Sequence, residues 1–500
     1  MDIKRGKLNI SVAIGFKLIT MVMSIVVKVV LVDVCGNEVN GLNALYLSII
    51  GMLSVAELGV GSAITFCMYK PIVEGKNEVV SALYHLFKKL YLLIGCVIFC
   101  AGLAITPFLR YFAKDYAEIN VNMYVTFLLL LTSVTATYLY SANISLINAY
   151  KNNYITTAIT QGGLVLLYVL QILALYVTRS FVCYLICRSI TVLIQMVATQ
   201  IVTKRKYAAI IETKAKLDAP TAKMVTKNIK AMFIHKIGYV LVNTVDSVVI
   251  SSFVGVISLG EYSNYTMVLT SMTGIINLVF TSLTSVIGHL CVEEDRITAR
   301  KYCESFHLLN FFIGTVFFLG YYAVIDNLIA ILFSADLVVT RDISLVITMN
   351  GFVQFMRRNI LTFRDATGSF YSDRWKSLFE GTLNIVLSIL LVRHIGVTGV
   401  IVATIITNLL ICHIVEPYVL YKNAFEGSVH RYYLKNYSMI LIFATALLAL
   451  NTCVRTSLSG WGELLLNGLT SLAVSAIVCA VWGLFSRRET VQLAKILRKG

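Results

Sequence analysis

Charged residues are scarce in this sequence. Asp, Glu, Lys and Arg make up 14% of its 500 residues, whereas about 25% is usual for a soluble protein. Hydrophobic residues reach 58%, and the mean hydropathy is +0.80. These values exclude a soluble globular protein of this length and indicate a polytopic membrane protein.

Several catalytic motifs are also missing. The sequence contains no Walker loop (GxxxxGK followed by Ser or Thr), no paired cysteine motif and no GxSxG element. Its longest loop, of about thirty residues, is shorter than the roughly 50 residues that a separate domain needs. We therefore expect neither ATP hydrolysis nor a globular catalytic domain. The chain is predicted not to be an enzyme and to bind no cofactor.

Cysteine is present, but not in a metal-binding pattern. The 11 Cys are scattered, mostly within apolar stretches. The closest spacings of Cys and His are one helical turn: Cys96 with Cys100, Cys183 with Cys187, and Cys303 with His307. No second pair completes a four-ligand site. Apolar packing is the favoured interpretation, and no metal is expected.

Long apolar stretches fill most of the chain. A bilayer-spanning helix needs roughly 20 apolar residues, and the sequence contains about 14 such stretches. The predicted cuts, or boundaries between neighbouring spans, at Arg179 and Arg393 separate spans that are nearly continuous. The first apolar run is too long for a signal-peptide core, so we interpret it as an uncleaved span.

The basic residues predict the orientation of these spans. Lys and Arg accumulate on the cytoplasmic side of membrane proteins, and placing both termini in the cytoplasm puts most of the 42 Lys and Arg there. The net charge of +16 is then explained by topology and by attraction to anionic membrane lipids. Nucleic-acid binding is not expected.

The sequence repeats itself at an offset of 219 residues. The offset aligns Lys17 with Lys236, Ser24 with Asn243, Gly36 with Gly255, Gly41 with Gly260, and Tyr46 with Tyr265. The prediction is an all-α protein with two parallel six-helix repeats, over residues 1–202 and 231–420, because six spans precede the second copy. A basic cytoplasmic linker over 203–230 joins them, and 421–500 adds two C-terminal helices and a basic tail.

Each repeat carries polar residues on one face of its first helix. At 100° per residue, the following residues form two narrow stripes: Lys17, Ser24 and Lys28 in the first copy, and Lys236, Asn243 and Ser247 in the second. Such a face is costly in lipid, so it is predicted to line a cavity or a helix contact. The alternative for Lys17 and Lys236 is that each side chain snorkels to the cytoplasmic face.

Other charges within predicted spans are candidates for function. Glu57 is either a coupling-ion or proton site or a structural partner of Lys17 or Lys28, and Asp246 is either a coupling carboxylate or a member of an ion pair. Arg357 either snorkels and so helps to set the topology, or it faces the predicted cavity and contacts a phosphate there. Arg188 is a further candidate for a basic residue of that cavity.

Three segments carry a resemblance to a known family. AELGVGSAITFCMYKP (56–71), TVDSVVISSFVGVISLGEYSNY (244–265) and RDATGSFYSDRWKSLFEGTLNIVLSILLV (364–392) resemble the bacterial polysaccharide-biosynthesis flippases. These belong to the multidrug, oligosaccharidyl-lipid and polysaccharide exporter (MOP) superfamily. The resemblance implies two six-helix bundles, often with two extra C-terminal helices, in the bacterial cytoplasmic membrane.

The resemblance also implies a substrate and partners. The expected substrate is an undecaprenyl-pyrophosphate-linked oligosaccharide, moved to the outer leaflet by a secondary transporter that H⁺ or Na⁺ drives. Glycan polymerase machinery is a further expected contact. Lys17, Lys28 and Lys236 are the positions that match the family's basic cavity residues, with Arg188, Arg357 and Asn243 as additional substrate-binding candidates.

Two alternatives to this function remain open from the sequence. The first is another exporter of the same fold, a drug extruder or a peptidoglycan-precursor flippase. A drug-cation exporter should favour acidic over basic cavity residues. The second is a polytopic glycan polymerase or ligase, which would need a larger outer loop than the one over 326–341, whose only carboxylates are Asp326 and Asp336.

Overall fold

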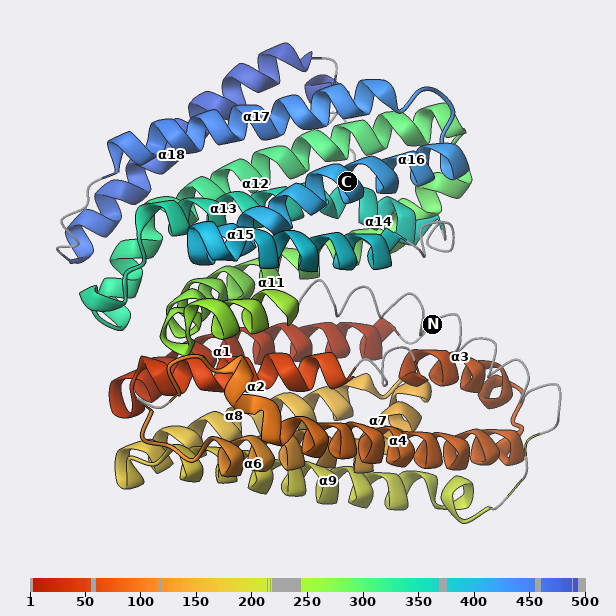
Figure 1. The fold of residues 1–500 in the computed structure, drawn as a ribbon. Coiled ribbons are helices and arrows are strands. Elements are labelled where there is room, and N and C mark those ends of the chain that lie inside the picture. The colour runs from red at the N-terminus through yellow and green to blue at the C-terminus, as the bar shows by residue number, and fades with distance from the viewer. Residues whose placement is uncertain are drawn as a thin grey trace. The chain divides into compact units, whose positions relative to one another are not determined.

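The structure is a computed structural model that describes residues 3–54, 60–116, 119–213, 244–367, 376–454, 460–487 and 489–492, and, singly, 215 and 217. Every long regular element in these ranges is a helix. The chain divides into two compact units, Met1–Gly260 and Glu261–Gly500, and each is described by itself (Figure 1).

Within the described residues, the first unit contains the helices α1 to α9, followed by one short apolar helix. The bounds of α1 to α9 are α1 (Ile3–Cys35), α2 (Asn37–Leu53), α3 (Val60–Val73), α4 (Asn77–Ile105), α5 (Leu109–Phe112), α6 (Met123–Ala136), α7 (Tyr138–Ala149), α8 (Asn153–Thr178) and α9 (Phe181–Glu212). The short helix Thr244–Val254 ends in a π-helical turn, and α11 (Val256–Glu293) begins directly after it.

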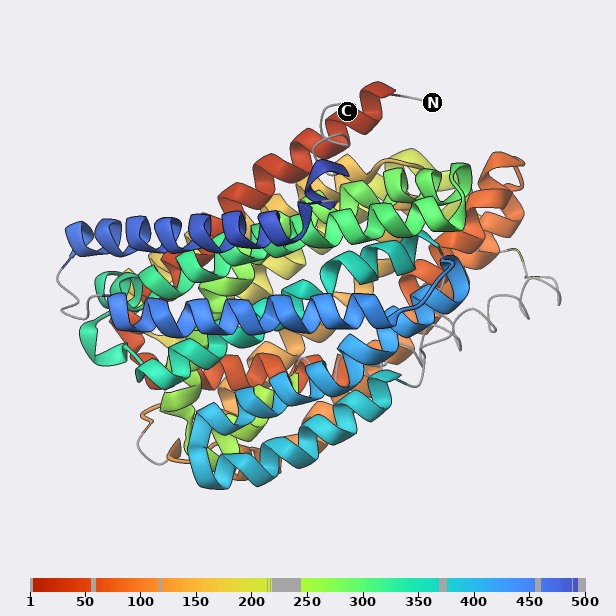
Figure 2. The ribbon, with the colours of Figure 1, turned by 90° about the horizontal axis from the view of Figure 1, so that it is seen from above.

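The second unit contains most of α11 and the helices that follow it. These are α12 (Arg296–Leu332), α13 (Arg341–Met356), α14 (Arg358–Ala366), α15 (Lys376–Thr407), a π-helical turn over Asn408–Cys412, α16 (His413–Ala424), α17 (His430–Cys453) and α18 (Trp461–Phe485). The long helix α12 packs against α13, α17 and α18 (Figure 2). Its aromatic side chains form the core of this unit together with Phe352 and Phe443, whose rings stack at 3.6 Å.

Helix ends fall where the backbone or the sequence requires them. Gly36 (φ +91°) separates α1 from α2, and Gly255 (φ +152°), its partner in the sequence repeat, separates Thr244–Val254 from α11. A glycine tolerates these positive φ values because it has no Cβ. The predicted cut at Arg179 coincides with a left-handed residue (φ +48°) between α8 and α9. The cut placed at Arg393 lies close to a kink at Ile395 and Gly396 inside α15.

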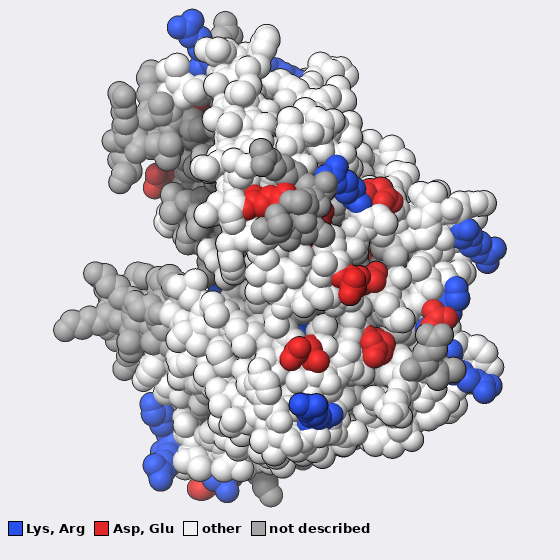
Figure 3. Space-filling view, turned by 90° about the vertical axis from the view of Figure 1, so that its left-hand side faces the viewer, with Lys and Arg blue, Asp and Glu red and all other residues white. Residues whose placement is uncertain are grey.

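The described helices fit a membrane. Nine of those in the described ranges are long and apolar enough to cross a bilayer. Many large apolar side chains point outward, among them Val177 and Phe485, which are 81% and 82% exposed. On the face in Figure 3, which looks onto one end of the helices, acidic and basic side chains stand on a surface that is otherwise uncharged. The prediction of an all-helical polytopic membrane protein is confirmed.

Candidate functional site

Two repeat-related turns meet in the first unit and fix the start of α2. Asn37 donates a hydrogen bond to the carbonyl of Ile257 (3.0 Å), and Asn40 donates one to that of Gly260 (3.2 Å). Backbones approach so closely there that a Cβ on Gly41 would overlap the carbonyl oxygen of Val256. Close backbone approach through glycine is typical of helix contacts in membranes.

A cavity of about 250 Å³ lies beside this contact and belongs entirely to the first unit. Four helices line it at helical spacing: α1 with Ser24, Val27, Lys28 and Leu31; α2 with Asn40, Asn43, Ala44 and Leu47; α8 with Leu164, Leu167, Tyr168 and Gln171; and α9 with Tyr184 and Arg188. The spacing of three, four and seven residues puts the α8 side chains on one helix face. Lys28 and Arg188 thus reach one cavity from helices far apart in sequence.

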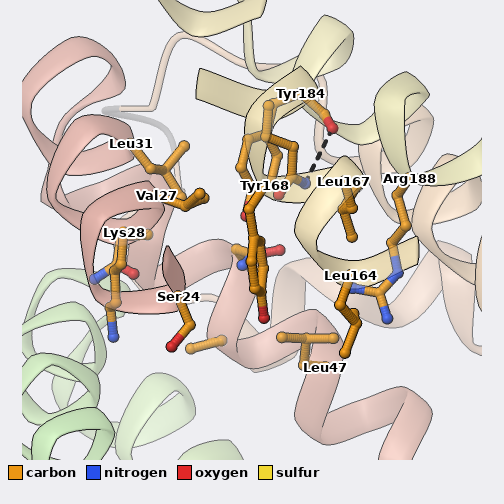
Figure 4. Close-up of a pocket in the computed structure, with 14 residues that line it drawn as sticks. Ser24, Val27, Lys28, Leu31, Leu47, Leu164, Leu167, Tyr168, Tyr184 and Arg188 are labelled. Atoms are coloured by element: carbon orange, nitrogen blue, oxygen red, sulfur yellow. Dashed lines mark hydrogen bonds between the residues drawn. The ribbon is translucent and has the colours of Figure 1, made fainter. Parts of the chain in front are cut away.

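Figure 4 shows how these side chains lie. The Tyr168 ring stands between Lys28 and Arg188 in this view. Gln171, which is 2% exposed, donates a hydrogen bond to the carbonyl of Tyr184 (3.3 Å) and so ties α8 to the start of α9. This bond fixes the backbone one turn before Arg188. The Arg188 guanidinium therefore extends from a helix, α9, that is hydrogen-bonded to α8 close by.

The cavity suits an anion. Among the described residues that line it, two are basic and none is Asp or Glu. The Lys28 ammonium offers three donors on a flexible stem, and the Arg188 guanidinium offers a planar fork that matches phosphate oxygens. The hydroxyl and amide groups of Ser24, Asn43 and Tyr168 can donate further hydrogen bonds. Its volume is that of about eight waters at roughly 30 Å³ each, which fits a charged headgroup and not a whole lipid.

The second unit holds its charges differently, in a buried cluster of ion pairs. Arg357, at the break between α13 and α14, binds Glu416 through two bonds of 2.6 and 3.0 Å and lies 3.6 Å from Glu380. Lys376 lies 2.5 Å from Glu416 and 3.3 Å from Glu380. Two cations and two carboxylates therefore balance one another, as buried charges must to offset their lost hydration. Arg357, with 14% of its side chain exposed, is the most accessible of the four.

The structure places the predicted site residues in different surroundings. Lys28 and Arg188 both line the cavity, whereas Lys17 is exposed near the start of the α1 span. Arg357 is bound by carboxylates. Asp246 is buried in the short helix before Gly255. The remaining candidates, Lys236, Asn243 and Glu57, lie outside the described residues.

Sequence reasoning missed several residues that the fold brings to these sites. Tyr168, Gln171 and Tyr184 look like ordinary span residues, and no local pattern marks them as cavity-lining. Glu416 did leave a signal, because a carboxylate within an apolar span is a functional or paired residue by default. Its pairing with Lys376, 40 residues earlier, required the chain to fold back on itself at the kink inside α15, at Ile395 and Gly396.

The helices define a multi-pass membrane protein whose fold is similar to those of MOP superfamily transporters. No protein-family model and no curated protein sequence matches the chain. Solved structures do match it in fold. Lipid II flippase MurJ in an inward closed conformation shares 15% identity at a TM-score of 0.62, covering 94% of this chain and 98% of that chain.

Two MATE transporter structures are also similar. A multidrug resistance MATE family transporter of the MOP superfamily, in an inward-facing conformation, shares 12% identity at a TM-score of 0.54 over 87% of this chain and 98% of that chain. The Vibrio cholerae MATE transporter VcmN shares 14% identity at 0.52 over 88% and 99%. These structural neighbours are transporters, not enzymes.

Proposed function

We propose that the chain is a flippase that carries an undecaprenyl-pyrophosphate-linked oligosaccharide from the cytoplasmic to the outer leaflet for surface polysaccharide synthesis. It works by alternating access, with the cavity of the first unit as the headgroup site. The observation that carries the proposal is that Lys28 and Arg188 both line that cavity, with no carboxylate among its described lining residues. A diphosphate that leaves water needs such fixed positive charge.

The same observation argues against a drug-cation exporter, because a cation would be repelled by this lining. A second candidate is a flippase for the peptidoglycan precursor, supported by the structural similarity to the lipid II flippase MurJ. Both candidates move an anionic, lipid-linked headgroup. They differ in the glycan, which extends beyond a cavity of about 250 Å³.

The remaining candidate residues keep roles in this proposal. Lys17, Lys236, Asn243 and Arg357 are proposed to contact substrate along its path. Asp246 and Glu57 are proposed to couple transport to H⁺ or Na⁺. Asp246→Asn should then leave folding intact and reduce the dependence of transport on an ion gradient. The proposed location is the bacterial cytoplasmic membrane, with both termini inside and glycan polymerase machinery as a partner.

Binding of the headgroup tests the proposal directly. Purified protein in nanodiscs is mixed with undecaprenyl pyrophosphate, and the complex is measured by native mass spectrometry. Lys28→Gln and Arg188→Gln should each weaken binding about 10- to 100-fold, because a hydrogen bond to a charged group contributes about 1.5–3 kcal/mol. Arg188→Lys should lose more than Lys28→Arg, because only a guanidinium binds a phosphate through a fork.

Lys88→Gln, which removes an exposed cation on α4, is the matched control and should bind like the unmodified protein. Undecaprenol, which lacks the diphosphate, should bind weakly to every variant. Equal binding of undecaprenyl pyrophosphate to the unmodified protein and to the double variant of Lys28 and Arg188 would show that the headgroup site lies elsewhere. Competition between oligosaccharide-linked and peptidoglycan-precursor lipids separates the two candidate substrates.

A further inference from the structure

Within the first unit, the two sequence repeats are joined by hydrogen bonds onto backbone carbonyls. Asn37, in the first repeat, donates to the carbonyl of Ile257 at the start of α11 (3.0 Å). Asn40 donates to the carbonyl of Gly260, one turn further along α11 (3.2 Å). Both asparagines are buried, with 6% and 3% of their surface exposed. We call these bonds, together with those of the loop described next, the repeat contact.

The loop between α5 and α6 forms the second part of the repeat contact. The last carbonyls of a helix have no partner within that helix, and Lys114 binds two of them at the end of Thr244–Val254. Its backbone N–H donates to the carbonyl of Ser251 (3.1 Å), and its ammonium donates to that of Phe253 (3.1 Å). The N–H of Val256 donates to the carbonyl of Lys114 (3.4 Å). The first repeat therefore holds the end of one helix and the start of the next.

The bonds of the repeat contact are suited to opening and closing. The core of the second unit, around Phe352 and Phe443, is apolar, and such a core opens only by exposing apolar surface to water. A hydrogen bond can instead exchange its partner, and the loss of one changes an equilibrium only about 2- to 12-fold. Gly41 and Gly260 also let the backbones approach without side chains that interlock.

Asn40 belongs to the repeat contact and also lines the cavity of Lys28 and Arg188. Its amide nitrogen donates to the Gly260 carbonyl and to the side-chain oxygen of Asn37 (3.2 and 3.3 Å), which is the long end of the range for such bonds. An amide NH₂ has two donors, and these two bonds use both. An anion in the cavity can therefore bind this amide only by replacing one of them. A charged phosphate oxygen attracts an N–H more strongly than a neutral carbonyl does.

We propose that the repeat contact is a gate and that the occupant of the cavity releases it: an anionic headgroup takes the Asn40 amide away from Gly260. No covalent bond changes and no proton moves. The link between the repeats is then loosened only when a headgroup is in place. This inference rests on the proposed function, because it needs an anionic headgroup in the cavity. In the proposed orientation the contact lies towards the outer side, since α1 runs from the cytoplasm to Gly36, and its release favours discharge of the headgroup there.

Thiol labelling of the full-length protein in nanodiscs tests the release. In a background without native Cys, Ser251→Cys places a thiol at a position with 0% exposure whose carbonyl is part of the repeat contact. A membrane-impermeant maleimide should label this thiol slowly. Undecaprenyl pyrophosphate should raise the labelling rate about 2- to 12-fold, which is the effect of losing one hydrogen bond. Undecaprenol, which has no diphosphate, should leave the rate unchanged.

Two asparagine variants separate the trigger from a general loosening of the contact. Asn37→Ala and Asn40→Ala each remove a bond of the contact, so each should raise the labelling rate without lipid about 2- to 12-fold. Asn37 is not among the described residues that line the cavity, and Asn37→Ala should still respond to saturating undecaprenyl pyrophosphate. Asn40→Ala should not respond further, because its bond to Gly260 is already lost.

The outcomes of the labelling test are distinct. An unchanged rate in the Ser251→Cys protein, with undecaprenyl pyrophosphate bound in the native mass spectrum, would overturn the release of the gate. A response that persists in Asn40→Ala would overturn the part played by Asn40. Absence of lipid binding in the mass spectrum is a separate result, which contradicts the proposed function.

A reversible cross-link tests whether the contact must open during transport. Lys114→Cys and Phe253→Cys lie at exposed positions, and a short bifunctional thiosulfonate reagent can join them. The cross-linked protein should still bind undecaprenyl pyrophosphate but lose transport of the linked glycan, and a thiol reductant should restore it. Each single variant, treated in the same way, is a control and should keep transport. Transport by the fully cross-linked protein at the unmodified rate would overturn the gate.

Discussion

At the scale of single residues, the close helix contact in the first unit depends on two glycines, because these residues have no Cβ. Gly41 meets the backbone of Val256, and Gly260 meets that of Asn37, so neither position has room for a Cβ. The asparagine bonds described above form only because these backbones come close. Asn40 joins the contact to the cavity, because it bonds Gly260 and also lines the space that holds Lys28.

Gly41→Ala should lower the free energy of unfolding by about 1–3 kcal/mol, because overpacking forces the helices apart. Gly15→Ala is the matched control: Gly15 lies on α1 with nothing within 4 Å of an added Cβ. It should be neutral or stabilising by up to about 1 kcal/mol, since alanine favours helix. Thermal unfolding in detergent measures both. Equal stability of the two variants would contradict the close contact.

Only some of the residues that line the cavity can be predicted from the sequence. Lys28 and Arg188 could be singled out because a charge within an apolar span is costly, and the repeat could be seen because Gly36 and Gly41 recur at Gly255 and Gly260. Their neighbours could not. Tyr168 and Gln171 line the cavity because α8 packs on α1 and α9, and such contacts between distant segments leave no local pattern.

At the scale of helices, a break between two helices positions the buried charged group of Arg357. The apolar stretch that contains Arg357 does not form one continuous helix: α13 stops at Met356, and α14 begins at Arg358. No proline or glycine stands at this break. It is stabilised from another helix by Asn310, which donates to the carbonyls of Phe355 and Met356. A break held by tertiary bonds cannot be read from local sequence.

The ion-pair cluster at this break gives a prediction. Glu416→Gln leaves Arg357 and Lys376 with Glu380 as the one carboxylate of the cluster, and an uncompensated buried charge costs about 3–5 kcal/mol of stability. Glu416→Gln combined with Lys376→Met restores a balance of one cation and one anion and should recover most of this loss. Glu78→Gln, at an exposed site, is the control for unfolding measurements.

A loss of stability in Glu416→Gln that the second substitution does not recover would show that the Glu416 side chain acts through packing. If Glu416→Gln is as stable as the unmodified protein, the four charged groups of the cluster do not compensate one another. Because Arg357 is held here by Glu416, substrate contact by Arg357 requires that this bond opens.

At the scale of the whole molecule, the charge distribution predicts which side each loop faces. With both termini in the cytoplasm, Asn37 and Asp336 are predicted to face outward. A cysteine placed at Asp336, which is exposed, should react with a membrane-impermeant thiol reagent from outside. Cysteines at Lys214 and Arg431 should react only after the membrane is opened. The measurement needs a background without the 11 native Cys. Labelling of Lys214→Cys from outside would reverse the predicted orientation.

Transport itself tests the central claim most directly. The protein is reconstituted into liposomes with an undecaprenyl-pyrophosphate-linked oligosaccharide, and an added glycosidase reports how fast the glycan appears on the opposite leaflet. The unmodified protein and Lys88→Gln should move the glycan, whereas the double variant Lys28→Gln with Arg188→Gln should move it at least about tenfold more slowly. Movement by that double variant at the unmodified rate would contradict this claim.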